Sequence, residues 1–509
     1  MALGTAHDGK AEREQRELVE EASEDHSSND LQTPNLKTRN GIVLMPQPSD
    51  DPLDPLNWSS FRKHMAMGTI SYLAFVCYMT VTAIIPGTQQ LADDFHVKKA
   101  TAVYLGNTPV ALYAVGPLLW SPLSHFIGRR PVMILGNIVT IVGTILAAAA
   151  QNYGTCMAGR ILLGFGGSCF WCLGPPSIGD IFFRHEKGKK IGISTLAIVV
   201  APFAGGIMGG GIINNKSLGW RWSQWISLIL IGIGFLALLV FVPETIYIRR
   251  EVTVESSTEK PSLWARYGVH IPKRHPDHQH SFFYVFSRPF VMLAFPAVLL
   301  SSFWFGVAYM LHVGITSDIP IIFQPAPYNF DSLDIGLSAF SGLIGGLLGE
   351  LYAGPALDFI AKRALKRNEE WKPEMRLKAI WPALITAPGG LIMFGLSIQF
   401  GTSWVTPLVG QGIYIFGIEI ATTVIQTYVL ECYPKQGAEA SLVFNLFRNL
   451  LSYTTPFFLP GMWKHTGQGG AFGVFAALIV FFFPLTIGVL MWRGQEIRDK
   501  GGDPGWSRD

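Results

Sequence analysis

Twelve stretches of this chain are apolar over about 20 residues each, which is the length an α-helix needs to cross a hydrocarbon core roughly 30 Å thick. In lipid no water satisfies the backbone, so only helices or closed barrels cross a membrane. The stretches are continuous and lack the alternation of barrel strands, which selects helices. The sequence therefore predicts an all-α membrane protein with twelve crossings. The predicted helices cover residues 66–86, 102–122, 131–150, 155–178, 191–213, 222–242, 290–312, 334–357, 379–399, 404–429, 439–461 and 471–492.

Composition agrees with this class, because 49% of the 509 residues are hydrophobic and only 15% are charged. The net charge is only +3, and we find no basic patch that would indicate binding of nucleic acid. We find no nucleotide-binding loop, and neither a metal-ligand cluster nor a set of nucleophile, base and oxyanion donors lies at a common depth in the predicted helices. The histidine-rich segment HPDHQH (275–280) could bind a metal, but in a linker it is more often solvated. We therefore expect neither an enzyme nor an ATP-driven pump, and we expect no cofactor and no metal.

A polar, charged segment in the middle of the chain separates six predicted helices from six others, which indicates a linker between two domains. The predicted organisation is a disordered tail (1–60), a six-helix bundle (61–242), a linker (243–289), a second six-helix bundle (290–492) and a C-terminal tail (493–509). Most lysines and arginines fall in the tails, the linker and the loops on the same side. The positive-inside rule then places both termini in the cytosol.

A short basic segment occurs twice, at corresponding places in the two halves. SPLSHFIGRR (121–130) follows the second predicted helix, and GPALDFIAKR (354–363) follows the eighth. Gly128 and Ala361 are expected to allow a tight turn, and the bases after them would hold it against the anionic inner face of the membrane. A weaker echo relates Asp180 and the residues after it to Glu431 and the residues after that. Two echoes in register indicate parallel repeats, the architecture of transporters that rock about a site near the midplane.

Several motifs together resemble the major facilitator superfamily, and within it the fungal drug:proton antiporters with twelve helices. They are DPLNWS (54–59), GPLLWSPLSHFIGRRP (116–131), GRILLGFGGS (159–168), GWRW (219–222), PET (243–245) and YVLECYPKQGAEAS (428–441). The resemblance implies the two-bundle facilitator fold. It also implies that each repeated turn is a latch between inward-open and outward-open states.

The resemblance and the second echo assign the latch residues, which are His125, Arg129, Arg130 and Asp180 in the first half and Asp358, Lys362, Arg363 and Glu431 in the second. His125 stands where the family usually has an acid. It either makes the first latch sensitive to pH or fills space while Asp180 does the pairing.

Four ionisable residues fall inside predicted membrane helices, where a charge is costly and marks a candidate functional site. Glu350, Glu419 and Arg448 belong to one half and could form a buried ion pair or a proton site. By the resemblance, Arg160 is the basic residue of a helix-4 motif that the family associates with proton transfer. The alternative is that Arg160 extends its charge outward to water and that Glu419 and Arg448 form static ion pairs.

The fifth predicted helix carries small residues and a proline that suit a hinge against a rocking helix. These hinge residues are Pro202, Gly205, Gly206, Gly209 and Gly210. The antiporter pattern places the proline beside the glycines, and its displacement here leaves import open as an alternative to export.

Aromatic and polar residues in the predicted helices could line a cavity for an amphipathic organic molecule, although each could equally be a packing residue. They are Tyr72, Tyr78, Asn107, Trp171, Trp304, Tyr309, Tyr414 and Gln426. Asn215 begins a glycosylation sequon on a predicted outer loop.

These observations predict a monomeric, multi-pass transporter of the plasma membrane that exports a small organic compound, such as a drug, toxin or secondary metabolite, in exchange for protons. Its expected partners are that compound, protons and membrane lipids. Two alternatives stay open, namely uptake of a nutrient or an organic cation such as a polyamine, and a membrane sensor that does not transport.

Overall fold

The computed structural model describes residues 37–39, 42–49, 51, 53–215, 217–247, 281–367, 371–502 and 504. These residues are almost entirely helical, with one two-stranded hairpin formed by β1 (Thr38–Arg39) and β2 (Ile42–Val43). Most of the predicted tail 1–60 and of the linker 243–289 lies outside the described residues.

Six long helices form the first half, joined by short turns. They are α2 (Ser60–Thr82), α4 (Lys99–Ile127), α5 (Arg129–Ala148), α6 (Tyr153–Ile181), α7 (Arg184–Asn214) and α8 (Gly219–Phe241), with η1 (Pro55–Asn57) before α2 and with η2 (Ile85–Gly87) and α3 (Thr88–Asp94) between α2 and α4.

The second half repeats this pattern. Its long helices are α11 (Pro296–Phe323), α12 (Ser332–Lys366), α13 (Trp381–Gln399), α14 (Val405–Cys432) and α15 (Gly437–Phe483), accompanied by α10 (Phe282–Val291), η4 (Met292–Ala294), η5 (Pro373–Ile380), η6 (Pro434–Gln436), η7 (Pro484–Gly488) and α16 (Val489–Gly501).

The twelve predicted crossings are present once the last helical run is divided. The described residues contain eleven helical runs long and apolar enough to cross a membrane, and the last, Pro434–Gly501, has 68 residues. At about 1.5 Å per residue it is several times longer than one crossing requires. Gly467 breaks it, with φ 70° and ψ 169°. The run is therefore two crossings joined by a sharp turn.

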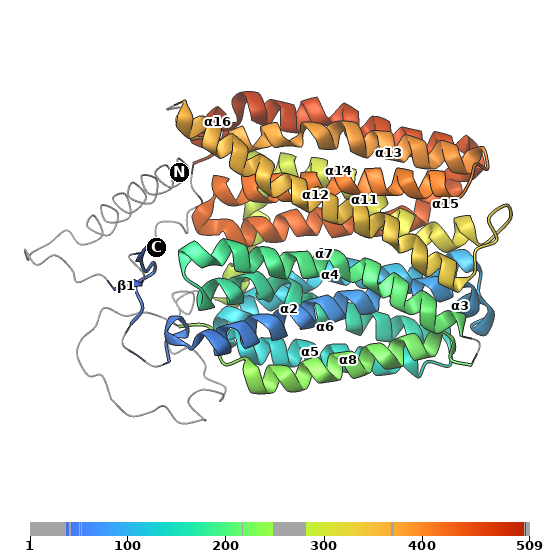
Figure 1. Ribbon diagram of the computed structural model, residues 1–509, viewed down its shortest axis with the longest axis horizontal. Coiled ribbons are helices and arrows are strands. Elements are labelled where there is room, and N and C mark those ends of the chain that lie inside the picture. The colour runs from blue at the N-terminus through green and yellow to red at the C-terminus, as the bar shows by residue number, and fades with distance from the viewer. Residues whose placement is uncertain are drawn as a thin grey trace, which may run out of the picture.

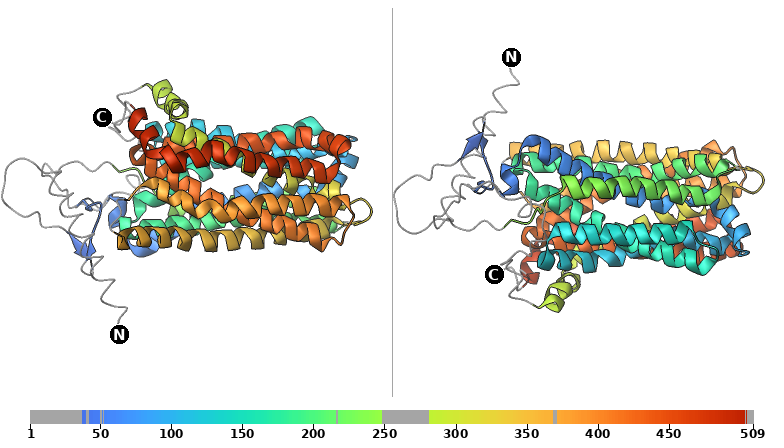
Figure 2. Two further views of the ribbon diagram at one scale, coloured as in Figure 1. Left: turned by 90° about the horizontal axis from the view of Figure 1, so that it is seen from above. Right: turned by 90° about the horizontal axis from the view of Figure 1, so that it is seen from below.

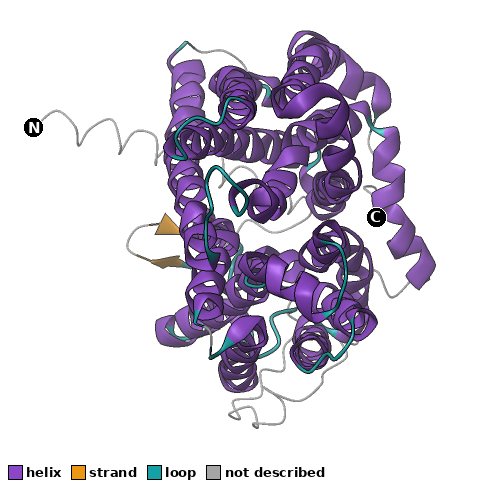
Figure 3. Cartoon of the chain, turned by 90° about the vertical axis from the view of Figure 1, so that its right-hand side faces the viewer, coloured by secondary structure: helices purple, strands orange, loops and turns teal. Residues whose placement is uncertain are grey.

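The two halves lie side by side as separate bundles with their long helices nearly parallel (Figure 1). The view from above has the second half in front and the view from below has the first half in front, which agrees with this division, and α10 lies beside one end of the bundles (Figure 2). The hairpin β1–β2, residues 243–247 and α16 share that end, which we call the terminal end. The end that carries α3 and the loop 324–331 is the far end. Figure 3 shows the bundled helices end-on.

Small residues bring helices within each half into backbone contact, as expected where lipid supplies no hydrophobic drive between helices. A Cβ atom on Gly143 would collide with the backbone of α6 at Leu163, and one on Gly159 would collide with α5 at Ala147. Large apolar side chains such as Leu236 and Ile385 instead remain mostly exposed on the outside of the bundles. This is the surface that a lipid-embedded protein presents.

The end of the predicted tail is ordered, which corrects the boundary of disorder at residue 60. Asp54 is fully buried and accepts hydrogen bonds from the backbone N–H of Ser49 (3.0 Å) and Leu56 (2.9 Å). Lys63 donates to the Leu56 carbonyl at 2.9 Å, and Tyr247 donates to Asp51 at 2.9 Å. Local capping at DPLNWS, together with these contacts to α2 and to the start of the linker, orders a segment whose composition alone suggested a mobile tail.

Candidate functional site

Helix α7 lies between the two halves, and its four paired glycines divide between two neighbours. A Cβ atom on Gly205 would collide with the Met79 carbonyl of α2, and one on Gly209 with the Ala83 carbonyl just beyond that helix. A Cβ on Gly210 would lie 2.7 Å from Cα of Gly336 on α12 in the other half. In each pair, the first glycine packs against its own half of the protein. The second glycine, Gly206 or Gly210, faces the other half.

Pro202 completes the hinge residues predicted on this helix. It lies inside α7, and its carbonyl accepts a hydrogen bond from Thr82 of α2 at 2.7 Å. A Cβ on Gly206 would lie 3.3 Å from Cβ of Ala339 on α12, which is slightly closer than an ordinary van der Waals contact. The structure therefore places all five predicted hinge residues on a helix in contact with both halves, and bending there stays a prediction.

Further contacts join the halves toward the far end. Lys99 on α4 donates to the Pro320 carbonyl at 3.0 Å and to Oε1 of Gln324 at 2.5 Å. Ser317 on α11 hydrogen bonds Asn107 on α4. The halves are thus held together at the far end of the molecule.

Arg448 occupies the middle of this interface. Its guanidinium lies 5.0 Å from the ring centre of Trp171 in the first half and 4.3 Å from that of Tyr309 in the second. It also donates to the Tyr309 hydroxyl at 2.8 Å, while its Nε is buried without a hydrogen-bond partner among the described residues. A partly buried cation between two aromatic rings is stabilised by cation–π attraction, which adds to the hydrogen bond that Arg448 makes with Tyr309.

Aromatic rings from the first half surround this cation. Tyr78 lies 5.1 Å from both Tyr113 and Trp171, measured between ring centres. In the second half, Tyr309 stacks on His312 at 4.7 Å. The resulting central cluster, which consists of Arg448 and these five rings, is a rigid and mostly apolar surface with one fixed positive charge.

The two predicted intramembrane carboxylates lie beside this cluster on α12 and α14. Glu419 is 4% exposed and packs against Gly349. Glu350 accepts a hydrogen bond from Thr423 at 3.1 Å. Within the described residues, neither carboxylate forms an ion pair with Arg448, although that arginine is close enough for its charge to act on Glu419. The suggested static ion pair is therefore wrong, and the role in proton transfer stays a prediction.

Arg160 does not extend outward to water, so that alternative is wrong. It is fully buried and donates to the carbonyls of Leu105 (2.8 Å), Thr80 (3.2 Å) and Val81 (2.5 Å). The last two belong to the final turn of α2, where carbonyls lack helical partners and carry partial negative charge. Arg160 also reaches Gln224 of α8 at 3.3 Å, so one cation ties four helices together.

Two small cavities lie beside the central cluster and are lined by residues of both halves. Their polar lining residues are Tyr78, Thr82, Asn107, His312, Thr316, Ser317, Ser338 and Gln411. Sequence reasoning found only Tyr78 and Asn107 in this set. His312 and Ser317 lie at or beyond the end of the predicted helix 290–312, and a shift of α11 to Pro296–Phe323 brings them into the interface.

Two residues predicted for the cavity lie elsewhere. Trp304 is 1% exposed and donates to the Ile479 carbonyl at 3.0 Å, within the second half. Tyr72 donates to the Leu230 carbonyl of α8 at 3.1 Å, within the first half. Both are packing residues, which corrects the prediction. Tyr414 is fully buried and bonds the Ala308 carbonyl at 2.7 Å, and Gln426 is half-buried on α14.

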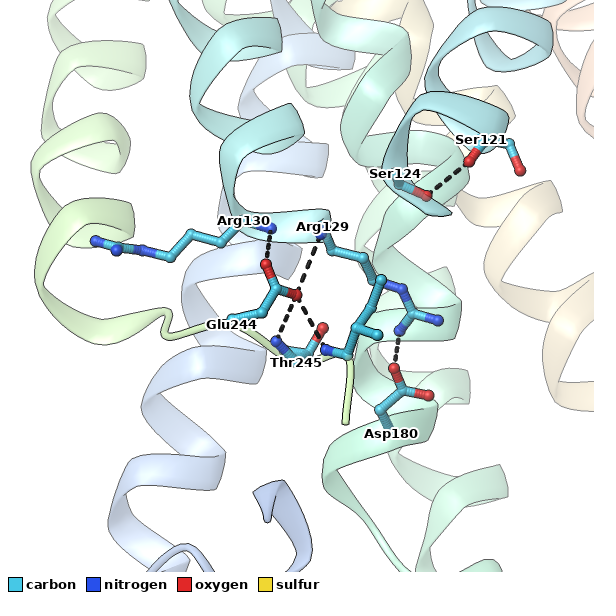
Figure 4. Close-up of polar contacts among 8 residues, drawn as sticks. Ser121, Ser124, Arg129, Arg130, Asp180, Glu244 and Thr245 are labelled. Atoms are coloured by element: carbon cyan, nitrogen blue, oxygen red, sulfur yellow. Dashed lines mark hydrogen bonds and ion pairs between the residues drawn. The ribbon is translucent and has the colours of Figure 1, made fainter. Parts of the chain in front are cut away.

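The residues predicted to form the first latch lie together at the terminal end (Figure 4). Arg129 pairs with Asp180 at the end of α6. Glu244 accepts hydrogen bonds from the backbone N–H groups of Arg129 and Arg130, both at 3.1 Å, and thereby caps α5. Gly128 makes the turn with φ 96°, a conformation that favours glycine. His125 lies in the last turn of α4, and its role as a pH sensor or a space filler stays untested.

The second copy of the repeat is not a turn, which corrects that prediction. Helix α12 continues through GPALDFIAKR to Lys366, because Ala361 keeps a helical backbone. Gly128, at the corresponding place in the first copy, has φ 96° and ends α4. Asp358, Lys362 and Arg363 are exposed. Among the described residues they have no ion-pair or hydrogen-bond partner beyond their own helix. In the part of the chain that the structure describes, the first copy of the repeat therefore carries an ion pair to another helix and the second copy does not, and the role of either as a latch stays a prediction.

The second half has its own ion pair at the place that corresponds to Arg129–Asp180. Arg376 in η5, before the third long helix of that half, forms two hydrogen bonds with Glu431 at the end of the fourth. Arg498 and Glu374 pair beside it at 2.9 Å. Asp180 and Glu431 thus each form an ion pair at the end of the fourth long helix of their half. Arg376, the basic partner of Glu431, lies in a segment that does not resemble the first half in sequence.

We expect the Arg376–Glu431 pair to contribute measurably to folding, because both side chains are less than one-third exposed and the contact is bidentate. A double-mutant cycle with Arg376→Gln and Glu431→Gln, measured by thermal unfolding in detergent, should give a coupling energy of about 1–3 kcal/mol. The exposed pair Arg221–Asp94 is the control, with a coupling below about 1 kcal/mol. Equal coupling in the two cycles would contradict the assignment.

The glycosylation prediction at Asn215 stays open. Its side chain is exposed at the end of α7, and its Oδ1 accepts a hydrogen bond from Ser217 at 2.7 Å.

Comparison with known families adds a second kind of observation. Residues 70–456 match the family model described as the Major Facilitator Superfamily. The chain is 28% identical over 460 residues to the MFS-type transporter penM of Penicillium rubens, with 88% of each chain covered. It is 25% identical over 457 residues to the efflux pump radE of Floropilus chiversii, covering 88% of this chain and 83% of that one.

Solved structures share the fold at low identity. The xylose transporter XylE of E. coli, in a partially occluded inward open conformation, matches with a TM-score of 0.59 at 15% identity, covering 85% of this chain and 98% of that one. The human organic anion transporter MFSD10 matches with a TM-score of 0.58 at 15% identity, covering 83% and 99%.

Proposed function

The chain belongs to the major facilitator superfamily of membrane transporters, and from this we propose that it exports a small organic compound in exchange for protons by alternating access. The observation that carries the proposal is Arg448, a fixed cation between Trp171 of one half and Tyr309 of the other. Rocking of the halves must separate these two rings. The affinity for a ligand that contacts both rings would therefore differ between the inward-open and outward-open states.

The surroundings of Arg448 support a coupling role for a carboxylate. Glu419 is buried within range of that charge and has no ion-pair partner among the described residues. A buried carboxylate is expensive to ionise, so its charge should depend on whether the neighbouring cavity holds water. We therefore propose that binding of a proton to Glu419 is the event that is coupled to release of the substrate.

The direction of transport and the membrane in which the protein lies are proposed from charge distribution and from relatives. The excess of basic residues near the terminal end favours a cytoplasmic location for it, and the plasma membrane is the compartment we propose. Export rather than uptake is supported by the names of relatives, one of which is called an efflux pump. With this orientation, the far end faces the exterior and is closed in the structure.

The test uses a strain that lacks this protein and a panel of toxic organic compounds. At least one compound should accumulate in the deletion strain, and its expulsion should return with the intact protein. Glu419→Gln should reduce expulsion at least tenfold, because a neutral amide cannot exchange a proton. The exposed Glu496→Gln on α16 is the matched control and should behave like the intact protein.

Reconstituted protein then separates the alternatives. Export predicts that a proton gradient drives the compound into inside-out vesicles, while uptake predicts the opposite direction. Absence of any proton-linked flux for every compound would favour a sensor that does not transport.

A further inference from the structure

We propose that Asp318 on α11 is a proton-binding site whose protonation is required for the far end to close. This inference rests on the proposed proton-coupled transport and adds a titratable group that the sequence did not reveal. The predicted seventh helix ended at residue 312, whereas α11 continues to Phe323 and places Asp318 inside the membrane-spanning bundle.

The first argument is the burial of a carboxyl group without partners. Asp318 is 0% exposed, and neither Oδ1 nor Oδ2 has a hydrogen-bond partner among the described residues. An ionised carboxylate in that position would have lost its water without any compensating donor. The carboxyl group is therefore neutral and carries a proton in the conformation shown.

The second argument is its place between two contacts that join the halves. The residue before it, Ser317, hydrogen bonds Asn107 on α4. Two residues after it, the Pro320 carbonyl accepts a hydrogen bond from Lys99, also on α4. Opening the far end must break both contacts and lets water reach this stretch of α11. Hydration then allows Asp318 to lose its proton, so closure requires that the proton be bound again.

Within the described residues, no neighbouring charged side chain pairs with Asp318 and thereby stabilises its ionised form. The acidic, basic and histidine side chains on α11 and on the elements packed against it toward the far end and the midplane are Lys99, His312, Asp334, Glu350, Glu419, Arg448, Lys464 and His465. Lys99 bonds Pro320 and Gln324, Arg448 bonds Tyr309, Glu350 bonds Thr423, Asp334 bonds Asp331, and Lys464 and His465 are exposed. None of these side chains forms a hydrogen bond or ion pair with Asp318.

The experiment measures opening of the far end directly and needs no substrate. Spin labels are attached at Lys98→Cys and Ser403→Cys, which are exposed positions at the far end of opposite halves, in purified full-length protein without its native cysteines. Their distance distribution is recorded from about pH 5 to about pH 9. We expect a short distance at acid pH and a growing long-distance population as the pH rises, because loss of the proton favours the open far end.

Asp318→Asn should keep the short distance at every pH, because an amide imitates the protonated acid and cannot ionise. Asp334→Asn, at an exposed acid on α12, is the matched control and should respond like the parent protein. A parent protein that does not respond to pH, or an Asp318→Asn variant that still responds, would overturn the proposal.

The outcomes separate this site from the proposed function. Proton-linked flux in the parent protein, together with an unchanged pH response in Asp318→Asn, would remove the site and leave the transport proposal standing. A pH response that depends on Asp318, in a protein that moves no compound, would do the reverse.

Discussion

Replacing Arg160 by methionine is expected to destabilise the protein by about 3 kcal/mol or more, a large part of a typical folding free energy of about 5–15 kcal/mol. Methionine fills much of the volume but donates no hydrogen bond. The carbonyls of Thr80, Val81 and Leu105 would then be buried without a donor, in a medium where no water replaces one. The measurement is the midpoint of thermal unfolding in detergent, with expression level as a second readout.

The control for this prediction is Arg493→Met on α16, an exposed arginine that lies over the ring of Trp492. It should change stability by less than about 1 kcal/mol. A folded Arg160→Met variant with an unchanged unfolding midpoint would show that other donors satisfy these carbonyls. Arg160→Lys is expected to be intermediate, since one ammonium group cannot reach all the acceptors that the planar guanidinium group bonds.

Replacing Gly210 by leucine is expected to leave the protein folded but to reduce transport at least tenfold. Any Cβ at this position lies 2.7 Å from both Cα of Gly336 and the Ser332 carbonyl, and these backbone atoms of the other half cannot move aside alone. The clash exists only while the far end is closed. The substitution should therefore trap the open far end, shown by a long distance between labels at residues 98 and 403.

Gly211 supplies a control one residue away. It is exposed, and a Cβ there meets nothing within 4 Å, so Gly211→Leu should transport normally and keep the short label distance at acid pH. The two variants have the same chemistry and neighbouring positions on one helix. If both behave alike, close packing of α7 against α12 does not control the far end.

Much of the fold could be predicted because lipid leaves few choices. Apolar length selects membrane helices, the polar linker separates two groups of six, and the repeated segment relates them. Helix limits were less accurate, because hydrophobicity cannot tell where a polar residue is buried among helices rather than exposed to water. The predicted seventh helix therefore stopped at 312 and missed Asp318.

Within the candidate site, the sequence predicted most clearly the residues whose charge is energetically costly inside a membrane. Arg160, Glu419 and Arg448 are conspicuous because a charge in an apolar stretch needs a reason. Their partners were not visible, since Arg160 bonds backbone carbonyls and Arg448 lies between rings from different halves. The same limit hid Arg376, the partner of Glu431, which lies in a segment with no visible repeat.

Twelve membrane crossings in two related halves could be predicted from the amino-acid sequence, because transfer of a segment to lipid depends on its local composition. Packing of the helices was needed to establish which charges meet, that GPALDFIAKR remains a helix while SPLSHFIGRR ends in a turn, and that Asp318 is buried without a hydrogen-bond partner among the described residues. The physical reason is that hydrogen bonds and cation–π contacts act over a few ångströms. Their partners come from helices far apart in the chain, brought together only by packing of the bundles.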